Sequence, residues 1–137
     1  MQADYSLLEE AFPEIDPGVQ PFGSRVVVQF RTAKQKTKGN IYLPNEVREA
    51  EKWNAQVAKV IAIGPLAFKS RTDQAPWPEG AWAAPGDFVR VPKHGGDKWE
   101  VKIPGREAGE EAIFAVLNDL DLIGKVLGDP LAMKAFI

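Results

Sequence analysis

Short β-branched segments separated by turn residues are the feature that most limits what this chain can fold into. Four such stretches, rich in valine, isoleucine or phenylalanine, occupy residues 25–30, 56–63, 87–91 and 112–117. A fifth, residues 98–103, follows the Gly95-Gly96 pair, which is typical of a hairpin turn. Residues 120–126 are a further candidate strand. Several short strands at near-regular spacing predict an all-β domain, built as a small barrel or a sandwich.

The composition limits the chain to one globular domain. Its 137 residues suffice for a single core, and 45% of them are apolar and 26% charged. A net charge of −2 gives no general reason to expect nucleic acid or an anionic membrane as partner. The absence of cysteine excludes disulfides and thiolate metal sites. The N-terminus is acidic, unlike a signal peptide, and no apolar run is long enough to span a membrane, so we expect a cytoplasmic protein.

Residues for catalysis are sparse. The single histidine, His94, stands beside Gly95 and Gly96 in a predicted tight turn, where a histidine is usually only solvated. No nucleophile motif surrounds Ser6, Ser24 or Ser70, and the glycines are scattered as turn residues rather than grouped around a phosphate. The sequence therefore predicts no enzyme, no metal site and no cofactor.

Both ends of the chain extend beyond the strand-forming region. Ser6 and Glu9 form a capping box, and Leu7, Leu8, Ala11 and Phe12 make a short apolar face, which predicts a short helix ending at Pro13. Residues 1–18 are thus interpreted as an N-terminal extension appended to the domain, and residues 127–137 as a C-terminal one. Asp129-Pro130 is a candidate start for a second short helix.

Two long connections lie between the strands. Residues 65–85 contain four prolines together with Trp77 and Trp82. Residues 31–54 are mostly polar, yet they hold the apolar tripeptide Ile41, Tyr42 and Leu43. This tripeptide either packs on its own barrel or is buried by another protein. The cations at 31, 34, 36 and 38, with four tryptophans elsewhere, also leave open a module that binds single-stranded nucleic acid or a peptide.

The order of the segments resembles the co-chaperonin family typified by GroES, across residues 19–126. The likeness rests on three motifs that occur in this order. The first is Pro-x-x-x-Arg-Val from Pro21 to Val26, and the second is Gly-x-Ile-x-Leu from Gly39 to Leu43. The third has two parts, a strand end from Val60 to Gly64 and then Gly-Asp-x-Val from Gly86 to Val89. The resemblance implies a small GroES-like β-barrel with a long mobile loop at about 31–54 and a roof-like connection at about 65–85.

The resemblance also implies a function, which is to form an oligomeric lid on a GroEL-type chaperonin that encloses client protein. The residues that the resemblance implies for chaperonin binding are Gly39, Ile41, Tyr42 and Leu43. Seven subunits form a ring, in which the first strand of one subunit pairs with the last strand of its neighbour. The interface residues carried over are Val19, Gln20, Pro21 and Phe22 on one side, and Leu122, Ile123 and Val126 on the other. No cofactor is implied for the lid, since ATP is used by the partner.

Three features depart from the family pattern. Tyr42 stands where the family usually has an aliphatic residue, the 65–85 connection is rich in tryptophan and proline, and both ends are extended. These departures suggest a hypothesis about source and client, namely a virus-encoded form adapted to a capsid protein. The alternative to the whole interpretation is a monomeric small β-barrel that binds single-stranded nucleic acid or a peptide.

Overall fold

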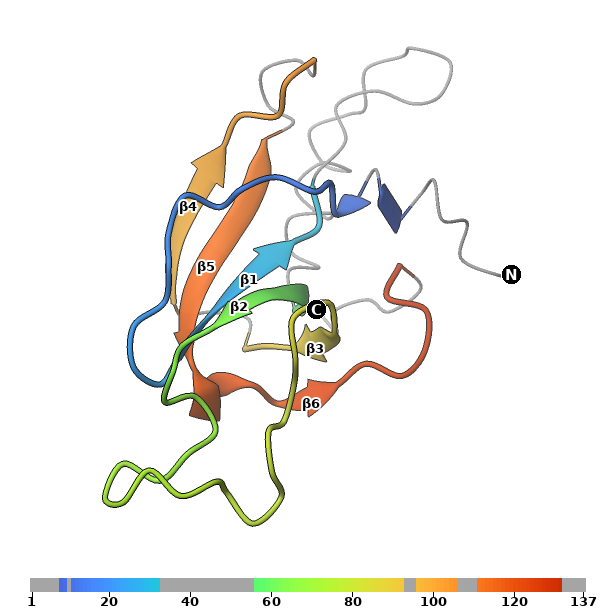
Figure 1. Ribbon diagram of the computed structural model, residues 1–137. Coiled ribbons are helices and arrows are strands. Elements are labelled where there is room, and N and C mark those ends of the chain that lie inside the picture. Colours follow the sequence, from blue (N-terminus) through green and yellow to red (C-terminus); the bar gives the residue numbers. More distant parts are fainter. Residues whose placement is uncertain (1–7, 10, 33–55, 93–95, 106–110, 132–137) are drawn as a thin grey trace.

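The described residues fold as a six-stranded antiparallel sheet, and the long connection 65–85 extends from one end of it (Figure 1). The computed structural model describes residues 8–9, 11–32, 56–92, 96–105 and 111–131. The strands are β1 (Arg25–Phe30), β2 (Val57–Ile63), β3 (Phe88–Arg90), β4 (Asp97–Val101), β5 (Ala112–Asn118) and β6 (Gly124–Lys125), and a 3-10 turn, η1 (Asp119–Asp121), lies between β5 and β6. Their order in the sheet is β4-β5-β1-β2-β3-β6. The predicted all-β fold is confirmed.

Strand β1 is the centre of the sheet. It pairs with β5 along its whole length and with β2 from Val26 to Phe30, with a register shift after Val27. Val26 to Phe30 are all buried, as expected for an apolar run too dense to alternate with polar residues. Alternate side chains therefore enter cores on both faces of the sheet.

The larger core lies on one face and is closed by the 65–85 connection. Val26, Val28 and Phe30 of β1 contribute to it, together with residues from β2, β3 and β5. Ala67, Phe68 and Ala83 of the connection are buried in the same cluster, and Trp77 and Trp82 pack against it. The connection is thus part of the core at its two ends, while residues 71–76 between them are exposed.

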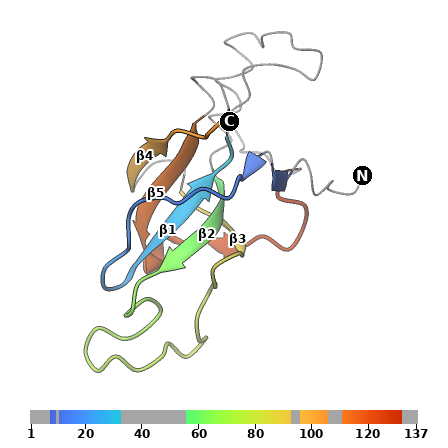
Figure 2. The ribbon, with the colours of Figure 1, turned by 45° about the horizontal axis from the view of Figure 1, so that its top comes forward.

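The smaller core lies on the other face and is covered by the N-terminal segment. Val27, Phe114 and Trp99 belong to it, and Ile15 packs on it from the segment before β1. Ala11 and Phe12 are also buried, at 2% and 4% exposure. The described part of the predicted N-terminal extension, residues 1–18, therefore packs on the domain. Figures 1 and 2 show it crossing the sheet as a dark blue trace.

The last strand is shorter than the sequence pattern predicts, and the expected helices lie only partly within the described residues. One helical turn is present, closed by a 2.8 Å hydrogen bond from Phe12 N–H to the Leu8 carbonyl, and Pro13 ends it. Residues 129–131 form a turn, and the rest of the C-terminal candidate helix lies outside the described residues. Only residues 124–125 of the candidate strand 120–126 are extended in the sheet, because Asp119 starts the turn η1 in front of them.

Candidate functional site

The segment that holds the predicted chaperonin-binding residues begins and ends at neighbouring strands. Gly39, Ile41, Tyr42 and Leu43 themselves lie outside the described residues, as does His94. Phe30 at the end of β1 is paired with Ala58 at the start of β2, so the chain leaves and re-enters the sheet at adjacent positions. The 65–85 connection joins the sheet at its other end, where Val26 pairs with Ile63. Segments 33–55 and 65–85 therefore start from opposite ends of β1 and β2.

Both attachment points of segment 33–55 are held by hydrogen bonds. Thr32, 2% exposed, donates its backbone N–H to the Ala11 carbonyl at 2.8 Å. On the returning side, the Gln56 carbonyl accepts the backbone N–H of Val91 at 2.8 Å. The residues on either side of the segment are thus fixed to the rest of the domain.

The predicted interface residues divide into exposed and buried groups. Val19, Phe22 and Ile123 are exposed at 43%, 76% and 63%, which is high for large apolar side chains. Gln20 is also exposed and Val126 is half-buried, whereas Pro21 and Leu122 are buried within the chain. Leu122 belongs to the larger core. No backbone hydrogen bond within the described residues joins 19–22 to 122–126.

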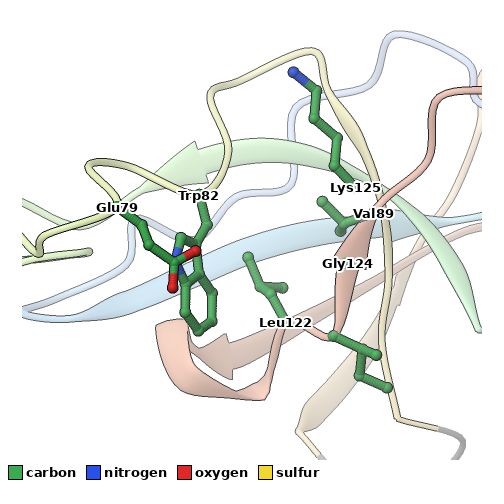
Figure 3. Close-up of a pocket in the computed structure, with 7 residues that line it drawn as sticks. Glu79, Trp82, Val89, Leu122, Gly124 and Lys125 are labelled. Carbon is green, nitrogen blue, oxygen red and sulfur yellow. The ribbon is translucent and has the colours of Figure 1, made fainter.

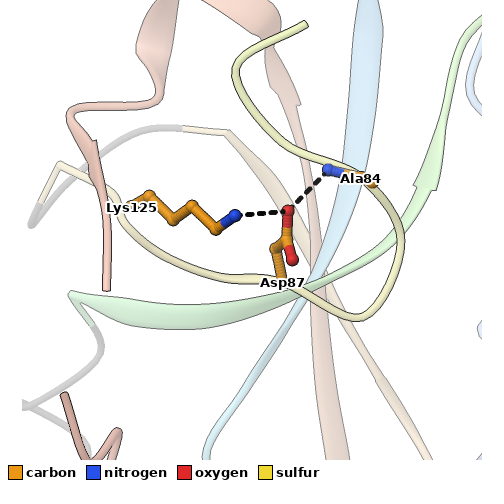
Figure 4. Close-up of polar contacts among 3 residues, drawn as sticks. All are labelled: Ala84, Asp87 and Lys125. Carbon is orange, nitrogen blue, oxygen red and sulfur yellow. Dashed lines mark hydrogen bonds and ion pairs between the residues drawn. The ribbon is translucent and has the colours of Figure 1, made fainter. Parts of the chain in front are cut away.

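Strand β6 is the last strand of the sheet and pairs only with β3 among the described strands. Lys125 is opposite Val89 and Gly124 is opposite Arg90. An ion pair of 3.5 Å from Lys125 Nζ to Asp87 Oδ2 fastens β6 to the turn before β3, and the same oxygen accepts the Ala84 N–H at 2.9 Å (Figure 4). The second edge of β6 pairs with no other described strand, and such an edge is a site where another strand can add.

A pocket of about 260 Å³ lies beside β6 (Figure 3). It is lined by Glu79, Trp82, Val89, Leu122, Ile123, Gly124 and Lys125. The Trp82 indole Nε1–H is buried and has no hydrogen-bond partner among the described residues. A buried donor without a partner is unusual in a folded protein, and an acceptor from outside the chain would satisfy it. Sequence patterns did not indicate Glu79 or Trp82 for this region, because only the folded connection brings them next to β6.

The 65–85 connection is ordered by aromatic packing. Phe68 contacts Trp77 edge-to-face at 5.6 Å between ring centroids, and Trp77 contacts Trp82 at 4.7 Å. An isolated bridge between Lys69 and Pro76 closes the hairpin-like tip. Figure 1 shows this connection projecting from the end of the sheet. The Trp- and Pro-rich sequence thus forms a defined projection.

The described tryptophans are used for internal packing. Trp99 stacks on Phe114 at 5.9 Å and donates its Nε1–H to the Pro17 carbonyl at 2.9 Å. Trp77 and Trp82 pack on the larger core. A surface that binds single-stranded nucleic acid needs exposed aromatic faces next to cations. These three side chains are therefore poorly placed for the alternative function.

Two classes of site are not found in the part of the chain that the structure describes. No group of three or more histidine, aspartate or glutamate side chains is placed to hold a metal ion there. No described helix is long and apolar enough to cross a membrane.

Comparison with known proteins places the chain in a family. Residues 18–126 match the model of the chaperonin 10 Kd subunit family, about four-fifths of the chain. The chain belongs to this family. The match begins within one residue of the predicted domain boundary and ends at it, and it leaves both extensions of this chaperonin 10 subunit outside.

Individual co-chaperonins are similar over nearly their whole length. The "Co-chaperonin GroES" of Syntrophomonas wolfei is 32% identical over 109 residues, which cover 79% of this chain and 97% of the relative. That of Methylacidiphilum infernorum is 30% identical over 114 residues, covering 83% and 99%. That of Thermus thermophilus is 32% identical over 110 residues, covering 80% and 93%. The predicted likeness to the GroES family is confirmed, and identities near 30% show that this co-chaperonin is divergent.

Proposed function

We propose that this chain is the subunit of a ring-shaped lid that binds a GroEL-type chaperonin in the cytoplasm. The observation that carries the proposal is the family match over residues 18–126, which spans the Gly39-x-Ile41-x-Leu43 pattern. The rooting of segment 33–55 at two adjacent strands supports it, because both ends of the segment leave the domain at one place. The lid has no catalysis of its own in this proposal, and the chaperonin uses the ATP.

Ile41, Tyr42 and Leu43 are the proposed contact with the chaperonin, and Gly39 is the proposed turn before them. Burial of Ile41 or Leu43 in a groove of the partner contributes ~1.5–3 kcal/mol each. Ordering the segment opposes binding by roughly 1–2 kcal/mol for each backbone residue. One segment alone therefore binds weakly, and tight binding comes from several segments held on one ring.

The ring is proposed to form by addition of one subunit's residues 19–22 to the open edge of β6 in the next subunit. Exposed Val19 and Phe22 then meet exposed Ile123, beside the pocket lined by Trp82. A head-to-tail contact of this kind closes into a ring when the rotation per subunit fits. Pro21 and Leu122 support the interface from within their own chain, because both are buried there.

The proposed function is tested with a double variant, Ile41→Ser with Leu43→Ser. Because the changes lie outside the described sheet, we expect the oligomer to stay intact while binding to a purified bacterial GroEL-type chaperonin with ATP is lost. Light scattering measures the first and co-sedimentation the second. Val47→Ser is the matched control, since it removes an apolar side chain from the same segment outside the tripeptide. Unchanged co-sedimentation of the double variant would contradict the proposal.

The oligomer and the client are tested in the same system. A seven-membered ring has seven times the chain mass of 15.1 kDa. The two extensions lie outside the family match, and they are among the departures that suggest a virus-encoded form. A viral capsid protein is therefore included among the clients of a refolding assay. A monomer that binds single-stranded DNA in a salt-dependent way would favour the alternative function instead.

A further inference from the structure

The N-terminal segment, residues 11–17, is tied to the sheet at points spread along its whole length. The Ala11 carbonyl accepts the Thr32 N–H at 2.8 Å, the Pro13 carbonyl accepts Gln29 Nε2–H at 2.9 Å, and the Pro17 carbonyl accepts Trp99 Nε1–H at 2.9 Å. Between these bonds Ile15 packs on the smaller core. This segment, which we name the strap, lies outside the residues that match the family.

The sheet carries side chains that suit the strap. Gln29 is 1% exposed in a strand whose neighbouring side chains are apolar, and its amide donates to the strap carbonyl of Pro13. Trp99 likewise directs its only polar atom to the strap carbonyl of Pro17. Without the strap, both donors would be left without these partners in a largely apolar environment, which is unfavourable. The sheet therefore supplies a side-chain donor for each of these two strap carbonyls.

The strap's first residues hold the place where segment 33–55 begins. Strand β1 ends at Phe30, so the ladder bonds of the sheet do not reach Thr32. The backbone N–H of Thr32 is instead bonded to Ala11, and the Thr32 side chain is buried. Phe12, next to Ala11, packs edge-to-face on Phe88 of β3 at 5.0 Å between ring centroids. Through this contact Phe12 packs the helical turn, which includes Ala11, against the sheet.

We propose that the strap fixes the root of the chaperonin-binding segment and that Phe12 is the positioning residue through which it does so. The inference rests on the proposed function for its effect on binding. Residues 31 and 32 are already placed by the strap and the sheet in the unbound chain, so binding does not have to order these two residues. Each backbone residue that must be ordered on binding lowers an affinity roughly five- to thirtyfold.

The test compares Phe12→Ala with Ile15→Ala in the full-length protein. Both variants remove a large apolar side chain from the strap, but only Phe12 lies next to the residue that bonds Thr32. Hydrogen exchange at the Thr32 amide is measured by mass spectrometry, and affinity is measured with a purified bacterial GroEL-type chaperonin and ATP. We expect Phe12→Ala to raise the exchange rate of Thr32 and to weaken binding, each at least tenfold, at unchanged oligomer mass. Ile15→Ala leaves both values within about twofold.

The outcomes separate the two proposals. Equal effects of Phe12→Ala and Ile15→Ala, or no change in Thr32 exchange with Phe12→Ala, would overturn the role of Phe12. Failure of the unaltered protein to bind any chaperonin would overturn the proposed function, whereas the fixed root is decided by Thr32 exchange alone. Phe12→Leu is the second variant if Phe12→Ala does not fold, because it keeps an apolar side chain but loses the aromatic contact with Phe88. It is expected to change both readouts in the same direction by a smaller factor.

Discussion

The Asp119 carboxylate accepts the backbone N–H of Phe68 at 2.9 Å, across 51 residues of sequence. Both residues are buried, at 3% and 2% exposure. Phe68 also has a positive φ of 61°, a backbone conformation that is unfavourable for a bulky side chain. This one bond ties the turn before β6 to the start of the 65–85 connection, and so it links the two regions that border the pocket at Trp82.

Replacing Asp119 by alanine is expected to lower the free energy of unfolding by ~1–3 kcal/mol, because the Phe68 N–H would stay buried without an acceptor. Asp119→Asn keeps a carbonyl oxygen at the same place and should lose less. Urea unfolding at one fixed protein concentration measures the difference, since an oligomer's apparent stability depends on concentration. Equal losses for the two variants would show that the hydrogen bond is not the cause.

Gly64 is expected to tolerate no larger residue. A Cβ at this position would overlap the Gly23 carbonyl oxygen and lie 3.0 Å from that of Arg25, and both of these atoms are backbone. Gly64→Ala therefore has to shift strand β1 or the connection, and we expect a loss of ~1–3 kcal/mol or a failure to fold. At Gly128 a Cβ would meet nothing within 4 Å, so Gly128→Ala is the matched control. A thermal melt of Gly64→Ala that matches this control would contradict the expectation.

The extent of the sheet could be predicted from sequence, because it depends on local patterns. The apolar runs predicted the bounds of β1, β2 and β5 to within one residue. The candidate strand 120–126 was placed less well. Its apolar residues suit a strand, but the buried Asp119 carboxylate accepts the Phe68 backbone N–H, and the turn η1 forms at this point instead. No local sequence pattern reveals this long-range hydrogen bond.

The strap was missed for a similar reason. Its sequence has a helix signal too short to be stable alone, so its packing depends on partners far along the chain. One local signal was present, namely Gln29 in an otherwise apolar strand, since a polar side chain buried on the sheet needs an acceptor. The acceptor is the carbonyl of Pro13, 16 residues away. The candidate tripeptide, by contrast, stands out locally as apolar residues in a polar segment, but its role was predicted only through the order of family motifs, and it lies outside the described residues.

The exposed tip of the 65–85 connection is expected to loosen at low pH. The pKa of Asp73 is lowered, chiefly because its carboxylate accepts the Ala75 N–H at 3.1 Å, with the Ser70 side chain as a second donor. A lowered folded pKa means that the stabilising contribution is present above the usual aspartate range and is lost as pH falls through the folded value. The Ala75 amide should therefore exchange faster below that pH, relative to an unstructured peptide at the same pH. Asp73→Asn should reduce this dependence on pH, and an unchanged profile would contradict the assignment.

The proposed ring interface makes a specific prediction about mixtures. Phe22→Glu and Ile123→Glu each place a charge on one of the two sides, so each variant alone should be a monomer of 15.1 kDa by light scattering. Leu127→Glu, at a residue 89% exposed outside the family match, should stay oligomeric. In an equal mixture of the first two variants, Phe22 of the Ile123→Glu chain can pair with Ile123 of the Phe22→Glu chain. The mixture should therefore contain dimers, whereas a self-complementary interface would give none.

The last prediction concerns how tightness arises from weak contacts. A synthetic peptide of residues 31–54 contains the whole tripeptide but lacks both the ring and the strap. Each copy has to be ordered independently, so its affinity for the chaperonin should be lower than that of the assembled ring by about 10²–10⁴. Titration calorimetry of the peptide, and competition of the peptide against the ring, measure the two affinities. The monomeric variant Phe22→Glu should bind more weakly than the ring, because it loses the linkage between copies, and more tightly than the peptide, because it keeps the strap. An affinity of this variant equal to that of the ring would mean that a single segment suffices, and the multivalent account would then be wrong.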